Sequence, residues 1–142
     1  MSTPYETKTH FTKTGGTAAS TTVSFPSRVF LQKLLIVQET LSGSTPTGSK
    51  GTDAFTVDVF NIDPALFGTD DDGGDNIFEE NHLVCPRQTA SSGVLAYYPS
   101  GIPFFNMDEP DHMGNQRKLY VRVNGAHTGR FHITVAGESD VG

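Results

Sequence analysis

The sequence predicts an all-β fold, a two-sheet β-sandwich of the jelly-roll kind. Short segments in which apolar and polar residues alternate recur along the chain, roughly seven to nine in number, as in strands with one buried and one wet face. The 15 Gly and 8 Pro are spread along the chain, so turns separate these segments. A length of 142 residues with 35% hydrophobic composition suffices for one buried core, and we expect one β domain.

The central and C-terminal segments carry the strand pattern. Residues 54–60 alternate between apolar Phe55, Val57 and Val59 and polar Thr56 and Asp58. Residues 119–123 and 131–135 do the same on either side of a Gly-bounded loop, which predicts a β-hairpin or two adjacent strands that cross between sheets. Residues 29–41 fit both a helical stripe and a strand; their β-branched residues and the lack of a Gly or Asn cap favour a strand.

The N-terminal residues differ from the rest of the chain. Residues 1–20 are rich in Thr and poor in large apolar side chains, which predicts a flexible arm over this segment with a possible edge strand at 10–13. Residues 21–142 then form the single jelly-roll-like domain. Its remaining expected elements are a loop at 42–53, short strands at 82–85 and 93–98, and a turn with an aromatic plug at 101–105.

Composition and charge argue against several function classes. With 16 acidic and 10 basic residues the formal charge is −6, which repels a phosphate backbone, so we expect no nucleic-acid partner. The apolar runs, such as residues 34–37, are far below the roughly 20 residues of a membrane helix. The N-terminus lacks signal-peptide features, so we expect no membrane and synthesis in a host cytoplasm. The single cysteine, Cys85, is expected to be a small buried hydrophobe.

An acidic segment at residues 70–76 is a weak calcium candidate. Asp70, Asp71, Asp72 and Asp75 offer carboxylates beside flexible glycines, and Ca²⁺ binds about six to eight oxygens. The spacing does not fit an EF-hand, because a Gly stands at a ligand position and no flanking helices are evident. We therefore expect a solvated surface loop, with no metal and no cofactor.

Neither zinc binding nor catalysis has a complete set of residues. His82 and Cys85 are three positions apart, so a regular strand would send them to opposite faces. No Gly-x-Ser-x-Gly motif occurs, and the carboxylates within 108–111 surround a proline as in a polar turn. The sequence therefore predicts that the protein is not an enzyme.

Several segments together follow the outline of a known group of proteins. They are Lys-Leu-Tyr-Val-Arg-Val-Asn at 118–124, Thr-Gly-Arg-Phe-His-Ile-Thr-Val at 128–135, Val-Ser-Phe-Pro at 23–26, the strand at 54–61 and Asn-Met-Asp at 106–108. In this arrangement the chain resembles small jelly-roll virion proteins of tailed bacteriophages. The resemblance implies a capsid decoration or cement protein in the virion, often a homotrimer, that binds the major capsid protein or other virion proteins and stabilises the head lattice.

Large or ionic side chains outside the predicted core are candidate anchors for such a partner. They are Tyr5, Phe11, Tyr97, Tyr98, Phe104, Phe105 and Arg117. An alternative function stays open, a virion- or enzyme-associated carbohydrate-binding β-sandwich module in which Tyr97, Tyr98 or Tyr120 stacks on a sugar ring. The absence of Trp weakens this alternative, because an indole is a common platform for sugars.

Overall fold

The computed structural model describes residues 3–15, 18–25, 29–64, 82–103, 117–125 and 127–139. Within these ranges the chain forms ten β-strands, and none of its segments there is a helix long and apolar enough to cross a membrane. The strands are β1 (Thr3–Lys13), β2 (Ala19–Phe25), β3 (Val29–Ser42), β4 (Thr45–Lys50), β5 (Phe55–Phe60), β6 (Gln88–Ala90), β7 (Val94–Tyr97), β8 (Ile102–Pro103), β9 (Arg117–Asn124) and β10 (Gly129–Ser139).

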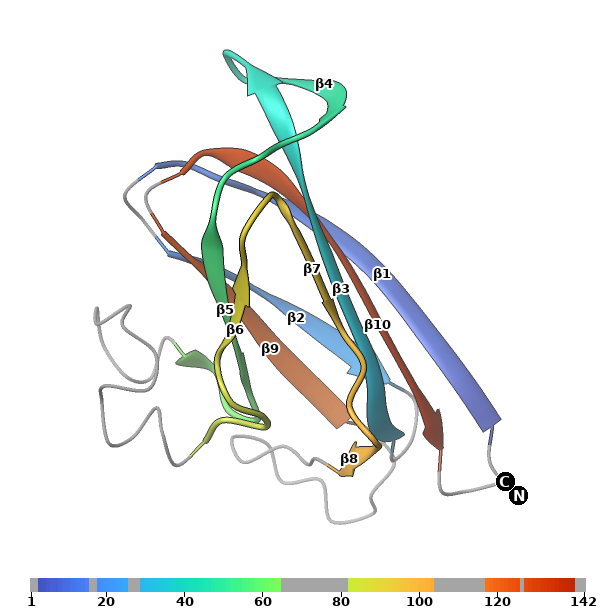
Figure 1. The fold of residues 1–142 in the computed structure, drawn as a ribbon. Coiled ribbons are helices and arrows are strands. Elements are labelled where there is room, and N and C mark those ends of the chain that lie inside the picture. Colours follow the sequence, from blue (N-terminus) through green and yellow to red (C-terminus); the bar gives the residue numbers. More distant parts are fainter. Residues whose placement is uncertain are drawn as a thin grey trace.

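The strands form two antiparallel sheets (Figure 1). Sheet A has the order β1-β10-β3-β4, with β7 and β8 also paired to β3, and sheet B has the order β2-β9-β5-β6. Nested pairs define the topology: β1 with β10, β2 with β9, β3 with β7, and β5 with β6. This is a long antiparallel hairpin folded over on itself, the arrangement of a jelly roll. The predicted two-sheet β-sandwich is confirmed.

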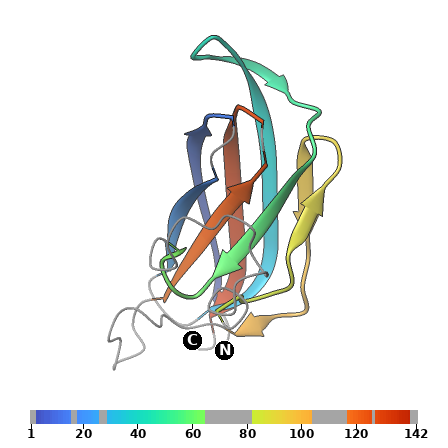
Figure 2. The same ribbon diagram turned by 90° about the vertical axis from the view of Figure 1, so that its left-hand side faces the viewer.

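The three clearest predicted strands are β5, β9 and β10. Their alternate apolar residues face the space between the sheets, which lie one behind the other in Figure 2. Because β9 belongs to sheet B and β10 to sheet A, the pair crosses between the sheets and is not a hairpin. The core contains side chains from both sheets that are almost fully buried, among them Leu31, Leu34, Ile36, Val57, Val59, Leu119, Val121, Phe131 and Ile133.

β1 is longer than the sequence predicted. We expected a flexible arm over residues 1–20 with a possible edge strand at 10–13, whereas β1 pairs with β10 in unbroken register from Thr3–Ser139 to Lys13–Gly129. The arm therefore does not include residues 3–13. An 11-residue backbone ladder stabilises a segment that buries only part of its own side chains, and this ladder depends on a strand at the other end of the chain.

The segment after β5 differs from the prediction, because the strand expected at 82–85 is absent there and β6 follows it at Gln88–Ala90. Residues 82–85 form no strand, and Leu83 makes a single bridge to Phe60. Cys85 is buried in the core, as predicted. Residues 101–105 include the two-residue strand β8, and the last two residues of this predicted aromatic plug lie outside the described part of the chain.

Two predictions concern β3 and its neighbours. The strand interpretation of residues 29–41 is confirmed by β3, and that of residues 93–98 by β7. Residues 42–53 contain more than the predicted loop, because β4 returns along β3 as a hairpin. This hairpin extends beyond the rest of the sandwich in Figure 1, and all six residues of β4 are exposed.

Candidate functional site

An apolar strip crosses the solvent-facing side of sheet A. The register places Val37 opposite Val94 and Leu35 opposite Ala96, and opposed residues of antiparallel strands point to the same side. Their neighbours along both strands are buried or, in the case of Tyr97, partly buried against the core, so these four side chains face away from the core. Tyr98 follows β7 and is 67% exposed, and Val94 is 37% exposed. We call these five residues the apolar strip.

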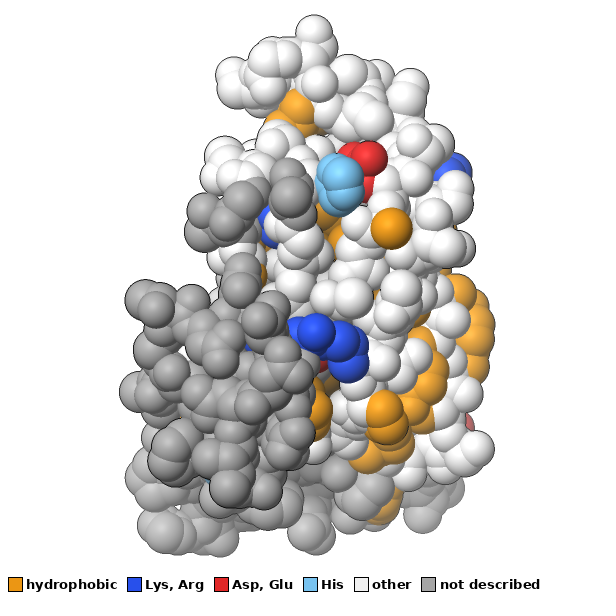
Figure 3. Space-filling view, turned by 60° about the vertical axis from the view of Figure 1, so that its left-hand side comes forward, with side chains coloured by type: hydrophobic (Ala, Val, Ile, Leu, Met, Phe, Trp, Pro, Cys, Tyr) orange, Lys and Arg blue, Asp and Glu red, His pale blue; other side chains and the backbone are white. Residues whose placement is uncertain are grey.

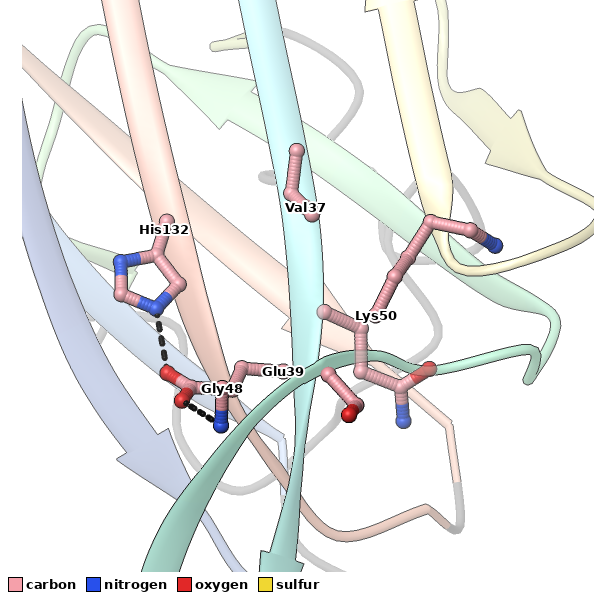
Figure 4. A pocket seen from close by; sticks show the side chains of 7 residues that line it. Val37, Glu39, Gly48, Lys50 and His132 are labelled. Carbon is pink, nitrogen blue, oxygen red and sulfur yellow. Dashed lines mark hydrogen bonds and ion pairs between the residues drawn. The ribbon is translucent and has the colours of Figure 1, made fainter.

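A row of ionisable groups lies beside the strip. His132 Nε2 is 2.7 Å from Glu39 Oε1, and the backbone N–H of Gly48 donates to Glu39 Oε2 at 2.7 Å (Figure 4). The hydrogen bond from His132 and then that from Gly48 hold the pKa of Glu39 below its ordinary value. Farther toward β1, Arg130 contacts the His10 ring, whose centroid is 5.8 Å from that of His132.

An open pocket lies where the row of ionisable groups meets the β3–β4 hairpin (Figure 4). It is lined by Val37, Gln38, Glu39, Gly48, Ser49, Lys50 and His132. The Lys50 ammonium group donates to the carbonyl oxygens of Gly51 and Ser92, at 2.9 and 2.8 Å, and so points away from the other lining residues. The pocket therefore presents a carboxylate, a hydroxyl, an imidazole and an apolar wall, a set that suits a polar protein surface better than an anion.

The base of the hairpin is fixed by a compact hydrogen-bond network. The backbone N–H of Gln38 donates to Gly93 O at 2.8 Å, that of Gly51 to Gln38 O at 2.7 Å, and that of Gly93 to Asp53 O at 2.9 Å. The buried Gln38 side chain donates to Asp53 Oδ2 at 2.7 Å. A Cβ atom on Gly93 would lie 2.0 Å from the backbone oxygen of Gly51, and one on Gly51 would displace the buried Gln38 side chain. The hairpin therefore projects from a rigid base.

Sheet B carries a buried ion cluster that the sequence did not reveal. The Asp58 side chain is fully buried and accepts two hydrogen bonds from Arg87, at 2.9 and 3.0 Å, one from Arg122 at 3.3 Å and one from Asn124 at 2.7 Å. The Arg122 guanidinium lies 5.0 Å from the Phe60 ring centroid. Figure 3 shows Lys and Arg atoms gathered in one area near the middle of this side. With its carboxylate occupied by donors, the cluster fits a structural role.

Asp58 looked solvent-facing in the sequence because it alternates with apolar residues. The missed signal is the register, since Asp58 lies directly opposite Arg122 on β9, which is distant in the sequence. No local pattern contains that pairing.

The aromatic anchors named from the sequence differ in exposure. Tyr5, Phe11 and Tyr97 are partly buried and pack against the core, so they offer a partner only part of their surface. Tyr98 is the exposed one of the four described rings. Among the three rings considered for sugar stacking, Tyr120 is buried, which leaves Tyr98 as the ring with a large open surface.

Other predicted site residues lie outside the described part of the chain. They are Asp70, Asp71, Asp72, Asp75, Phe104 and Phe105, together with the side chain of Arg117, whose backbone begins β9. The calcium prediction for the acidic loop therefore stays a prediction.

The thiol of Cys85 is in a poor environment for metal binding. Burial raises its pKa to about 11, and the nearby Asp58 charge adds to this effect, so the metal-binding thiolate form is disfavoured. Among the described residues, no group of three or more His, Cys, Asp or Glu side chains could hold a metal ion.

Comparison with known proteins assigns no relative. No family model matches the chain, and no curated protein matches it. Its function is therefore inferred from the fold and from the surfaces described above.

Proposed function

We propose that this chain is a structural protein of a tailed-bacteriophage virion, a decoration or cement protein that binds the head lattice and stabilises it. In this role it acts as a homo-oligomer, a trimer by its resemblance, and binds the major capsid protein or another virion protein. The apolar strip on sheet A is the observation that carries the proposal. Jelly rolls are a common architecture of viral capsid domains, which supports the choice of partner.

The strip has the composition of a protein contact. Its aliphatic centre and exposed Tyr98 are bordered by Glu39, His132 and Lys33, which resembles an interface with an apolar core and a polar rim. Tyr is among the residues that dominate binding energy at such contacts, because its ring buries a large area with few rotatable bonds. An exposed contiguous apolar surface also lowers solubility unless a partner covers it.

The β3–β4 hairpin supplies a second element for a lattice contact. Residues 40–49 include no charged side chain, and the glycines and hydrogen bonds at the hairpin base hold it in a projecting position. A rigid, neutral projection can enter a gap between neighbouring subunits with little loss of conformational entropy.

Co-sedimentation with phage particles from the source of the chain tests the proposal. The wild-type protein is expected to sediment with the particles, and Val94→Asp or Tyr98→Ala to reduce the bound fraction strongly. Thr22→Asp is the matched control, since it introduces the same charge at an exposed β-branched position of β2 in sheet B, and it should bind normally.

Three results would count against the proposal. A strictly monomeric protein that never sediments with particles would remove its main support. Equal binding by Val94→Asp and Thr22→Asp would mean that the strip is not the contact. Saturable binding to a glycan array that depends on Tyr98 would favour the carbohydrate-binding alternative.

A further inference from the structure

The outer edge of β1 is the longest strand edge of the molecule that the described residues leave without a partner strand. β1 has 11 residues, whereas the edge strands β2 and β6 of sheet B have seven and three. β1 pairs with β10 on one side, and within the described ranges no strand pairs with it on the other. Figures 1 and 2 place it at the margin of the sandwich. Long, regular edges readily add another strand, and proteins usually shorten, bulge or charge them.

The side chains of β1 divide by face. Pro4, Glu6, Lys8 and His10 point outward and are exposed, while Tyr5, Thr7, Thr9 and Phe11 point inward and are half-buried. Tyr5 and Phe11 pack against the core on one side and keep open surface at the margin of the sheet. A further strand beside β1 would cover this remaining aromatic surface.

The charges of β1 are self-complementary in one antiparallel register. Consider a second copy of β1, related by a two-fold axis through Thr7. Glu6 then lies opposite Lys8 of the second copy, and Lys8 opposite its Glu6, both pairs on the outer face. Opposite charges directly across a strand pair are favourable. Within one copy, Lys8 Nζ is already 3.6 Å from Glu6 Oε1, so the four groups would form an alternating cluster.

Neighbouring registers are less favourable. A two-fold axis at Lys8 would place the two Lys8 side chains opposite each other, and an axis at Glu6 would place the two Glu6 side chains opposite each other. Like charges directly opposite each other destabilise a strand pair. A shift of the pairing by one residue would put the inward side chains of one copy on the outward face of the other. Lys8 therefore discourages general strand addition and permits this one pairing.

We infer that the chain pairs with a second copy of itself through β1, antiparallel and centred on Thr7, so that sheet A continues across the two-fold axis. On the inward face this register places Tyr5 opposite Thr9 of the second copy and Thr7 opposite the second Thr7. Aromatic residues opposite β-branched ones, and Thr opposite Thr, stabilise strand pairs. The contact joins residues 3–11 of each copy.

This joint is independent of the proposed virion function. It lies at the edge of sheet A opposite to the β3 and β7 strands that carry the apolar strip, so a β1 dimer keeps the strip open to another partner. By itself the joint gives a dimer, and it is distinct from the trimer expected from the phage resemblance.

Sedimentation equilibrium of the full chain with charge-swap variants tests the joint. The free wild type is expected to show a monomer–dimer equilibrium in solution, whereas the trimer is proposed for the chain bound to the particle. Glu6→Lys and Lys8→Glu, taken singly, place like charges across the axis and should each raise the dimer Kd by about tenfold or more. The double variant Glu6→Lys/Lys8→Glu recreates the pattern with reversed signs and should return the Kd to within about threefold of wild type.

Two controls separate the contact from folding and from net charge. Glu138→Lys makes the same charge change on the exposed outer face of β10, one strand inside the edge, and should dimerise normally. Because Glu6 also lies 3.5 Å from Lys33, a folding defect in Glu6→Lys would leave Lys8→Glu to carry the test, with thermal melting as the check. A wild type that stays monomeric, or single and double variants with equal Kd, would overturn the inference, whatever the particle-binding result.

Discussion

Replacing Gly93 by Ala is expected to destabilise the protein strongly, whereas the same change at Gly43 should cost only about 1–2 kcal/mol. Both glycines have positive φ, +75° and +65°, so the left-handed backbone penalises a side chain at either position by about 1–2 kcal/mol. Their surroundings differ. A Cβ atom on Gly43 would meet nothing within 4 Å, but one on Gly93 would lie 2.0 Å from the carbonyl oxygen of Gly51.

The additional cost at Gly93 can be estimated from its contacts. Relieving an overlap with backbone atoms costs about 1–3 kcal/mol, because strands must move. Movement would also weaken the hydrogen bonds that Gly93 makes with Gln38 and Asp53, each worth about 1 kcal/mol. The sum for Gly93→Ala is therefore about 4–7 kcal/mol, a large share of a typical domain stability of about 5–15 kcal/mol.

Urea unfolding followed by far-UV circular dichroism measures both variants, since the chain has no Trp for fluorescence. Gly43→Ala is expected to lose about 1–2 kcal/mol of stability, and Gly93→Ala to lose at least about 3 kcal/mol more than Gly43→Ala. Stabilities that agree to within about 1 kcal/mol would refute the reasoning, because the backbone penalty alone would then explain both changes.

Three further predictions concern single side chains. Asp58→Ala removes the carboxylate that balances buried Arg122 and should lower the free energy of unfolding by about 3–5 kcal/mol, measured by thermal or urea unfolding. Asp58→Asn keeps one acceptor and should lose less stability. Equal losses in the two variants would argue against an ionic role. Hydrogen bonds lower the pKa of the Glu39 carboxyl in the folded protein from its ordinary value of 4.5. The contribution of Glu39 to stability is therefore present above pH 4.5 and is lost as the pH falls through the lower folded pKa. Glu39→Gln should flatten this part of the acid-unfolding profile, and profiles of wild type and variant that superimpose would contradict the assignment. With a pKa of about 11, the Cys85 thiol should resist a disulfide reagent at about pH 8 until the protein unfolds, and rapid labelling of the folded chain would disprove its burial.

The strands that the sequence predicted well are those whose pattern is local. β5, β9 and β10 alternate between apolar and polar residues because one face of each lies on the core. β3 was ambiguous because both of its faces are largely apolar, with the apolar strip on the outside. The sequence of β1 resembles a disordered segment, since its Thr-rich composition provides little apolar surface. Its order depends on pairing with β10, whose residues are separated from it by most of the chain.

The candidate site was predictable only in part. Tyr98, one of the anchors named from the sequence, is exposed, but the aliphatic residues around it become a surface only when β3 and β7 pair in register. The same holds for Asp58 and Arg122, which meet across β5 and β9. Composition identifies which side chains can make contacts, whereas the register of distant strands decides which of them lie together.

The topology places the two candidate contacts at opposite edges of one sheet. In sheet A, β1 and β7 lie on either side of the β10–β3 pair, so a contact along β1 and a contact over β7 can form at the same time. A two-fold contact alone closes a dimer, and a second, different contact on each copy is needed to link that dimer to a larger assembly. A lattice-binding protein would use the aliphatic centre of the apolar strip as a protein contact, whether or not β1 pairs, whereas a sugar-binding module would use the ring of Tyr98. Loss of particle binding in Val94→Asp with an unchanged β1 dimer would therefore favour the lattice role over the sugar-binding one.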